Sequence, residues 1–204
     1  VDPNDPAAVP AADRGSRILQ AAFEPGSIMK AVSSSMVLDT GTADEYDTVP
    51  APDRMNLDFD NEYIKDSFSH EDFTLSLAGV LRYSSNTGMT NFASQIPRET
   101  RYEYLKKFGF GSVSPLRFEG ESSGILHPAG QWDEMTNLVT TFGQGISVTS
   151  LQMAYAYQAI ANGGVRLDPI LVDSCLAADG SIAYAPNQGS TRVLSTSSAN
   201  LNLE

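Results

Sequence analysis

The sequence predicts a mainly α-helical fold with one short β-hairpin near residues 168–185. Several segments place apolar residues at the spacing of about 3.6 residues that is typical of an amphipathic helix. Outside residues 165–184, no convincing run rich in Val and Ile alternates as a half-buried strand would. Inside that range, two apolar runs flank Asp179-Gly180, a dipeptide typical of tight hairpin turns. Helices are therefore expected to form most of the fold.

The composition is that of a globular chain with an acidic surface. Its 204 residues are 41% hydrophobic and 19% charged, and this length suits one domain or part of a larger one. With 13 Lys and Arg against 25 Asp and Glu, the formal net charge is -12. Such a charge argues against nucleic acid and anionic membranes as partners, and its plain interpretation is good solubility.

The single cysteine, the apolar runs and the two chain ends bear on disulfide bonding, membrane insertion and the extent of the protein. Cys175 is the one cysteine, so no intrachain disulfide can form, and its apolar surroundings predict a packed side chain. No apolar run reaches the roughly 18 residues of a bilayer span, and no signal peptide opens the chain. We expect residues 1–14 to form an irregular arm. Val1 and Glu204 are expected to be boundaries of a piece of a longer protein.

The first predicted helix covers residues 26–38. Its apolar residues follow the helical spacing, Pro25 and Gly26 stop any earlier helix, and Gly41 ends this one. Ser27 therefore stands at the start of a helix rather than in its interior.

Further helices are expected after a polar, acidic excursion at residues 42–70. They span residues 74 to about 83, 87–96, 98–108 and 147–161, with Pro97 between two of them and a Gly-, Ser- and Pro-rich loop at 111–131. The helix at 147–161 has the strongest pattern, because Ser147 or Thr149 can cap its start and Asn162-Gly163-Gly164 can end it. Ser195 marks the start of one more helix.

Ser27 and Lys30 form the first candidate for chemistry. Residues three apart on a helix share a face, so the Lys30 amine can reach the Ser27 hydroxyl. A serine needs such a base to become a nucleophile, and desolvation would lower the lysine pKa toward the neutral form that a base requires. A helix start also supplies free N–H groups for an oxyanion. Alone, the pattern is weak and favours a capping serine followed by a solvated lysine.

Two further motifs strengthen this interpretation. Ser84-Ser85-Asn86 lies between two predicted helices, where Ser84 can relay a proton and the Asn86 amide can donate to a substrate carbonyl. Gly143 and Gly145 flank Gln144 and predict a close backbone approach beside a cleft. Each motif taken singly also has a plain structural interpretation. Ser84-Ser85-Asn86 can be an N-cap cluster, and the glycine segment can be a loop that leads into a capped helix.

Together, the motifs resemble the transpeptidase domain of class B penicillin-binding proteins, which build septal or elongation peptidoglycan. The similarity is carried by FEPGS leading into Lys30, YSSNTG at 83–88, FGQGISVT at 142–149 and IANGG at 160–164. It covers most of the chain, from residue 1 to about 200. The resemblance implies one incomplete transpeptidase domain over residues 1–204. This would be the helical part of the penicillin-binding and serine β-lactamase-like fold, with most of the central sheet missing.

The resemblance also implies roles for four residues. Ser27 matches the acylated nucleophile, Lys30 the general base, Ser84 the proton-relay serine, and Asn86 a residue that contacts the acyl donor. The implied reaction acylates the serine with a D-Ala-D-Ala stem peptide, releases the terminal D-Ala, and passes the acyl group to an amine. β-Lactams would acylate the same serine. The implied location is the extracytoplasmic face of the bacterial cell membrane, with the anchor outside this chain.

One family motif is absent from the sequence. The family carries K-[ST]-G on an edge strand, and none of Lys30, Lys65, Lys106 and Lys107 is followed by that pattern. That strand supplies the second oxyanion donor, and losing one such donor costs on the order of 10²–10³ in rate. We therefore expect the 204-residue chain by itself to be nearly inactive. Helices without a covering sheet would also expose an apolar face, so self-association stays open.

The remaining expectations concern partners and alternatives. Stem peptides, β-lactams and cell-division or elongation proteins are the implied partners, and no cofactor is expected. His70 and His127 lack partners at zinc-site spacing, so no metal site is expected. His70 is interpreted as a solvated helix start, and the acidic run at 58–72 as solvated surface. Two other functions remain open, namely a β-lactam-sensing receptor and a non-catalytic division scaffold.

Overall fold

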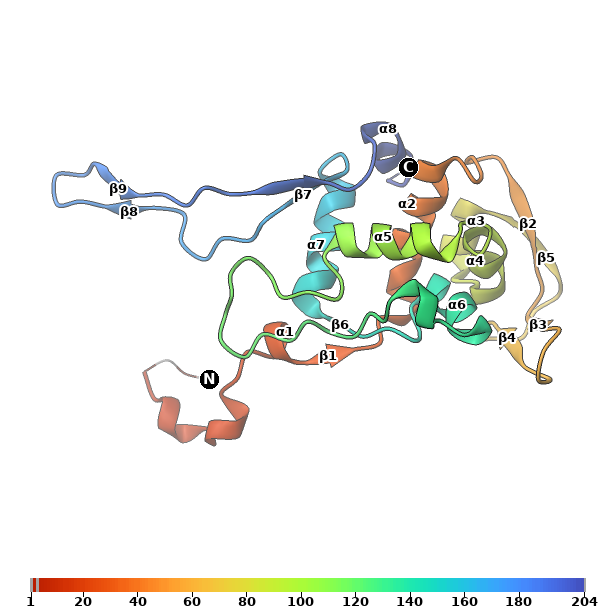
Figure 1. Ribbon diagram of the computed structural model, residues 1–204, viewed down its shortest axis with the longest axis horizontal. Coiled ribbons are helices and arrows are strands. Elements are labelled where there is room, and N and C mark those ends of the chain that lie inside the picture. The colour runs from red at the N-terminus through yellow and green to blue at the C-terminus, as the bar shows by residue number, and fades with distance from the viewer. Residues whose placement is uncertain (1, 3, 204) are drawn as a thin grey trace.

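The computed structural model describes residues 2 and 4–203, and its body is built around one central helix (Figure 1). This helix, α2 (Lys30–Thr40), contacts α3 (Leu77–Tyr83), α4 (Asn86–Ala93), α7 (Ser150–Ala161) and α8 (Thr196–Leu201). α5 (Arg98–Phe108) crosses in front of it in Figure 1. Buried apolar residues from these helices form one core cluster.

The helix predicted at residues 26–38 is present, with a tighter start than expected. Gly26–Met29 is a 3₁₀ turn that continues into α2. Gly41 ends α2 in a left-handed conformation, φ 66°, and its N–H bonds the Leu38 and Val37 carbonyls. Met29, Val32 and Val37 are fully buried, but so are Ser33, Ser34 and Ser35, so this central helix packs on all sides rather than on one apolar face.

The other predicted helices are also present, and two begin later than expected. α5 matches its prediction, α4 ends three residues early, and α7 begins at Ser150 rather than Ser147, capped by Thr149 in a full capping box with Gln152. α8 begins after the predicted cap, Ser195. The start predicted at residue 74 is wrong, because Phe73–Ser76 is strand β5 and Ser76 caps α3.

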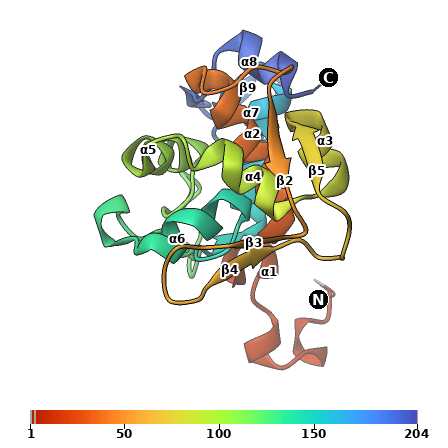
Figure 2. The same cartoon turned by 90° about the vertical axis from the view of Figure 1, so that its right-hand side faces the viewer.

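The prediction that residues 42–70 lack regular structure is wrong. β2 (Thr48–Ala51) pairs antiparallel with β5, and β3 (Arg54–Asn56) pairs with β4 (Tyr63–Lys65). Figure 2 shows β2 and β5 beside α4, and β3 and β4 below it. Each of β2, β3 and β4 is only three or four residues long, and half or more of its residues are exposed, so it lacks the long alternation by which strands are recognised. The expectation that strands occur only in residues 165–184 is therefore also wrong.

The predicted β-hairpin near 168–185 is confirmed, although its strands differ. β8 (Cys175–Leu176) pairs with β9 (Ile182–Tyr184), and at its base β7 (Val165–Leu167) pairs with β10 (Ser190–Arg192). The whole segment projects as a long arm from the body (Figure 1). The packed side chain predicted for Cys175 is wrong, because the residue is exposed on this arm.

Short elements complete the described chain. β1 (Ala22–Phe23) pairs with β6 (Val148–Thr149), and this pair joins the segment before Ser27 to the start of α7. The remaining elements are α1 (Arg17–Gln20), α6 (Glu134–Val139) and the 3₁₀ turns Pro6–Ala8, Ala11–Asp13, Ala129–Gln131 and Thr140–Phe142. Residues 1 and 3 of the predicted arm lie outside the described residues. Across the part of the chain that is described, no helix has the length and apolar character needed to cross a membrane.

Candidate active site

Ser27 and Lys30 meet at the start of the central helix. Lys30 Nζ lies 2.8 Å from Ser27 Oγ, as the spacing of the two residues predicted. Lys30 is only 2% exposed, although its side chain is cationic in water. An amine this buried needs hydrogen-bond partners, and the residues around it supply them.

Ser84 approaches the same amine from the end of α3. Its carbonyl oxygen lies 2.9 Å and its Oγ 3.2 Å from Lys30 Nζ. Ser84 has φ 56°, a left-handed conformation that is uncommon for a residue with a Cβ. Such strain persists only where the surroundings hold it, and here it turns the carbonyl and the side chain of one residue toward one nitrogen.

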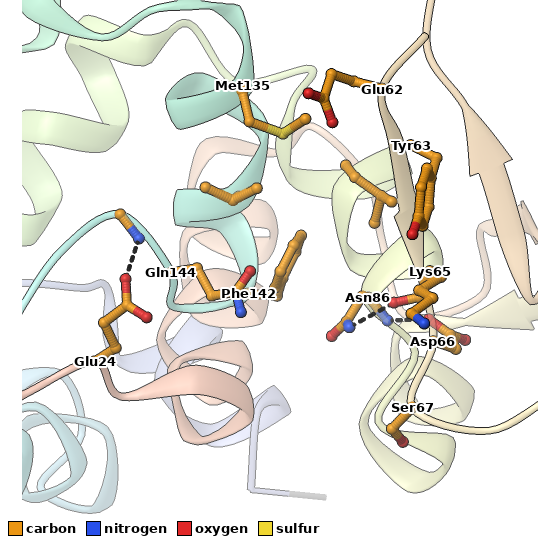
Figure 3. A pocket seen from close by; sticks show the side chains of 13 residues that line it. Glu24, Glu62, Tyr63, Lys65, Asp66, Ser67, Asn86, Met135, Phe142 and Gln144 are labelled. Carbon is orange, nitrogen blue, oxygen red and sulfur yellow. Dashed lines mark hydrogen bonds between the residues drawn. The ribbon is translucent and has the colours of Figure 1, made fainter.

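Asn86 is the first residue of α4 and completes the cluster. Its Oδ1 lies 2.7 Å from Lys30 Nζ, and its Nδ2 donates to the Lys65 carbonyl at 2.8 Å (Figure 3). The carboxamide therefore links the lysine to strand β4. The structure thus brings all four residues predicted from the sequence together around one amine.

The number of donors on this amine decides what it can do. The Ser84 carbonyl and Asn86 Oδ1 can only accept, so each requires one N–H from Lys30. A neutral amine has two N–H groups, which these acceptors use, and one lone pair. That lone pair can accept the proton of the Ser27 hydroxyl at 2.8 Å. The arrangement suits a neutral lysine that removes a proton from serine.

The electrostatics bring the neutral state closer to neutral pH, although the charged form still predominates at pH 7. Burial lowers the pKa of Lys30 to about 8, although the carboxylate of Asp66 acts in the opposite direction. Desolvation disfavours a charged amine because the protein interior solvates it less well than water. A base with a pKa close to the working pH is well placed for proton transfer.

The glycines predicted to make a close approach do so. Gly26 N–H donates to the Gly143 carbonyl at 2.8 Å, and Gly145 N–H donates to the Glu24 carboxylate at 2.9 Å. A Cβ on Gly143 would lie 2.2 Å from the Gly26 oxygen, and its φ is +86°. These contacts fix the turn that carries Ser27 against the loop before β6.

A cleft of about 710 Å³ opens beside Asn86. One wall comes from β4 and the other from α6 and the loop that follows it, as Figure 3 shows with Tyr63 and Lys65 facing Phe142 and Gln144. Glu24 lies at its rim. A substrate that occupies this cleft would lie against the Asn86 side chain.

Asp66 is a residue near this site that the sequence did not reveal. It was interpreted as part of a solvated acidic run, and this is wrong because it is 6% exposed. Its carboxylate accepts from the Asn86 N–H at 2.5 Å and from the Thr87 N–H at 3.1 Å. Nothing in the sequence separates Asp66 from its acidic neighbours, since its burial depends on the pairing of β3 and β4.

The comparisons with known proteins decide the family. A model described as the penicillin-binding protein transpeptidase domain matches residues 2–201. The chain belongs to this family. Penicillin-binding protein PbpB of Mycolicibacterium smegmatis is 34% identical over 190 residues, which make up 92% of this chain and 29% of that protein. Peptidoglycan D,D-transpeptidase FtsI of Escherichia coli K12 is 30% identical over 165 residues, 80% of this chain and 27% of that protein.

Solved structures agree with this assignment. Penicillin-binding protein 3 of Mycobacterium tuberculosis, crystallised with aztreonam, aligns with a TM-score of 0.85 at 33% identity, over 93% of this chain and 42% of that one. The penicillin-binding transpeptidase fold and the class B assignment are therefore confirmed. The chain spans less than a third of the length of these two curated relatives, 29% of one and 27% of the other.

Proposed function

We propose that this penicillin-binding protein chain carries the acylation centre of a peptidoglycan D,D-transpeptidase, with Ser27 as nucleophile and Lys30 as its base. The observation that carries the proposal is the Lys30 amine, which lies 2.8 Å from Ser27 Oγ and within hydrogen-bond distance of the Ser84 carbonyl and Asn86 Oδ1. The Escherichia coli relative is named a peptidoglycan D,D-transpeptidase, and the Mycobacterium tuberculosis relative was crystallised with a β-lactam. Stem peptides and β-lactams are accordingly the proposed acyl donors.

The proposed reaction has two halves. Ser27 Oγ attacks the donor carbonyl as Lys30 removes its proton, and a C–O bond forms. The tetrahedral intermediate collapses, the C–N bond breaks, and the proton passes through Ser84 to the leaving amine of the terminal D-Ala. An acceptor amine then attacks the acyl-serine and loses its proton to Lys30 as a C–N bond forms. The C–O bond to Ser27 breaks, and Ser27 Oγ takes the proton back from Lys30. Ser27 lies in the first turn of a helical segment, so its N–H lacks an intrahelical partner and can donate to the oxyanion.

Asn86 is proposed to hold the acyl donor. Its Oδ1 is occupied by Lys30, and one of its two N–H bonds is directed to the Lys65 carbonyl. The second N–H remains to donate to an amide carbonyl of the substrate in the cleft. The same contact would orient the side-chain amide of a β-lactam.

The setting of the reaction follows from the proposed substrate. Stem peptides are cross-linked outside the cytoplasm, so we infer that the protein acts at the extracytoplasmic face of the cell membrane. Division or elongation proteins are its proposed partners there. A non-catalytic scaffold is less well supported, because such a protein has no need for Ser27, Lys30, Ser84 and Asn86 around one amine. A receptor that keeps its β-lactam adduct would share the first half of the reaction.

A fluorescent penicillin tests the proposal. We expect covalent labelling of Ser27 that is abolished in Ser27→Ala, with the adduct located by mass spectrometry of the peptide that contains residue 27. The assay is run on the 204-residue chain, which is expected to react slowly because its sequence lacks K-[ST]-G. It is also run on any longer natural polypeptide that contains the chain. Labelling that persists in Ser27→Ala, or no labelling of either form, would contradict the proposal. Release of D-Ala from a pentapeptide donor separates the enzyme from the receptor.

A further inference from the structure

Asp66 is a buried carboxylate at the edge of the site, directly after strand β4. Its side chain is 2% exposed, and that of His70, which bonds it, is 6% exposed. A buried carboxylate is costly unless hydrogen bonds replace the water it has lost. The partners of Asp66 therefore show what this residue holds in place.

One oxygen of Asp66 holds the start of α4. Oδ1 accepts from the N–H groups of Asn86 and Thr87, at 2.5 and 3.1 Å. Gly88 N–H bonds Ser85 Oγ at 2.9 Å, and the N–H of Ser85, the N-cap, bonds the Val80 carbonyl at 3.1 Å. The four N–H groups that this helix leaves open at its start are thus satisfied, and Met89 N–H makes the first intrahelical bond, to the Ser85 carbonyl at 3.3 Å. A carboxylate there is also favoured by the helix dipole. The backbone position of Asn86 therefore depends on Asp66.

The other oxygen of Asp66 meets His70. Oδ2 lies 3.1 Å from His70 Nε2, and His70 Nδ1 lies 2.6 Å from the Glu71 carbonyl. Both partners accept only, so both contacts are hydrogen bonds when the imidazole carries two N–H groups. Burial acts to lower the pKa of His70, but the bonds to Glu71 and Asp66 outweigh it and raise the pKa. The ring stacks on Phe73 at 4.3 Å, with the planes 5° apart. The solvated helix start predicted for His70 is wrong.

We propose that Asp66, held by His70, is a positioning residue of the active site, which fixes Asn86 against Lys30 and sets the charge that the lysine amine experiences. The inference rests on the function proposed above. It extends the site to a segment, residues 66–73, that the motifs do not include. Neither residue touches the reacting atoms, so both act through Asn86 and Lys30.

The charges around the pair come from several elements. Lys30 faces Asp66 from α2, and the Asp66 carboxylate raises the lysine pKa against the effect of burial. Asp53, whose carbonyl accepts the Asp66 N–H at 2.8 Å, acts on His70 as a second negative charge. Arg54 and Lys65 line the same small hollow beside Asp66. Removing the charge of Asp66 therefore removes the effect that raises the Lys30 pKa, so this pKa becomes lower.

Two substitutions separate the charge of Asp66 from its hydrogen bonds. In Asp66→Asn, the amide oxygen can still accept from Asn86 and Thr87, and the amide N–H can donate to a neutral His70 Nε2. The helix start is kept and the charge is lost. Asp66→Ala removes both. Asp39→Asn is a matched control, because Asp39 accepts from Tyr104 and Ser195 at the opposite end of α2.

The first measurements need no catalysis. Lysine-selective NMR titration resolves Lys30 from Lys65, Lys106 and Lys107, the other lysines of the chain. We expect the Lys30 midpoint to move to lower pH in Asp66→Asn and to stay in Asp39→Asn. Amide exchange of Asn86 and Thr87 should stay slow in Asp66→Asn and become at least tenfold faster in Asp66→Ala. An unchanged Lys30 titration together with unchanged exchange would overturn the proposal.

The acylation rate gives the functional measurement. In a protein that labels at Ser27, we expect Asp66→Ala to slow acylation about 10²-fold, as a displacement of about 1 Å at a reacting group can do. Asp66→Asn should keep most of the maximal rate, with its pH profile displaced to lower pH. Loss in Asp66→Ala no greater than in Asp39→Asn would show a merely structural role. If Ser27 is not labelled at all, the proposed function is contradicted. The role of Asp66 is then still decided by the NMR measurements, which need no catalysis.

Discussion

The cluster around Lys30 and the arm at residues 165–192 differ in how they are held. The amine of Lys30 contacts residues from separate parts of the chain, Ser27, Ser84 and Asn86, and is almost fully buried. At its base the arm bonds the body through Arg166 and Leu167, but beyond the base it is held by local strand pairs. Its apolar side chains there face solvent, with Leu176 at 66% and Ile182 at 67% exposure. A change in the cluster should therefore spread through the body, whereas a change in the arm should stay local.

The strongest test of this contrast removes the amine. In Lys30→Met the side chain keeps its length and packing but loses the base, and the Ser84 carbonyl and Asn86 Oδ1 lose their donor. Loss of a general base costs about 10²–10⁴-fold in rate. We expect a decrease of this size in the rate of penicillin acylation, measured by stopped-flow fluorescence. A variant that retains the rate would show that another group deprotonates Ser27.

Gly143→Ala should have the next largest effect. Its Cβ would lie 2.2 Å from the Gly26 oxygen and 2.7 Å from Met29 Cβ, in a backbone with φ +86°. Strain and overpacking together predict a loss of about 2–4 kcal/mol in the free energy of unfolding. Urea unfolding followed by circular dichroism measures it. Acylation should fall as well, because the turn that carries Ser27 must move. Stability within error of the parent chain would mean that this contact can relax.

The pH dependence of acylation should report Lys30. Burial lowers its pKa to about 8, and the neutral form that acts as base increases as the pH rises through that value. The rate should therefore increase about tenfold per pH unit below this midpoint and level off above it. Pre-steady-state rates between pH 6 and 10 test the prediction. A rate that is flat from pH 6 to 8 would show that the lysine is already neutral there.

The sequence predicted the cluster better than the parts that support it. The spacing of Ser27 and Lys30 fixes their contact, because it is set within one helical turn. The contacts of Lys30 with Ser84 and Asn86 could be expected only from the family resemblance, because they depend on the packing of α4 against α2. Asp66 was missed because its burial depends on strands β3 and β4, which are too short to show a period. Local patterns do not predict such long-range contacts.

The arm shows the opposite limit of local prediction. Asp179-Gly180 predicted the turn, because a hairpin is decided by residues close in sequence. The exposure of Cys175 could not be predicted, because it depends on whether the hairpin packs against the body. The apolar neighbours of Cys175 in the sequence predicted a buried side chain, but the arm does not pack against the body at this residue.

The smallest effect is expected at Gly180, the arm counterpart of Gly143. Its φ is +82°, close to the +86° of Gly143, but an added Cβ would meet no atom within 4 Å. Gly180→Ala therefore isolates the backbone term, about 1–2 kcal/mol for a residue in the left-handed region. Because the arm can open by itself, this cost should appear as faster amide exchange at Ser181 and Cys175. The unfolding free energy of the body should change by less than about 0.5 kcal/mol. If Gly180→Ala destabilises the body as much as Gly143→Ala, the arm and the body unfold as one unit, and the contrast between the two regions does not hold.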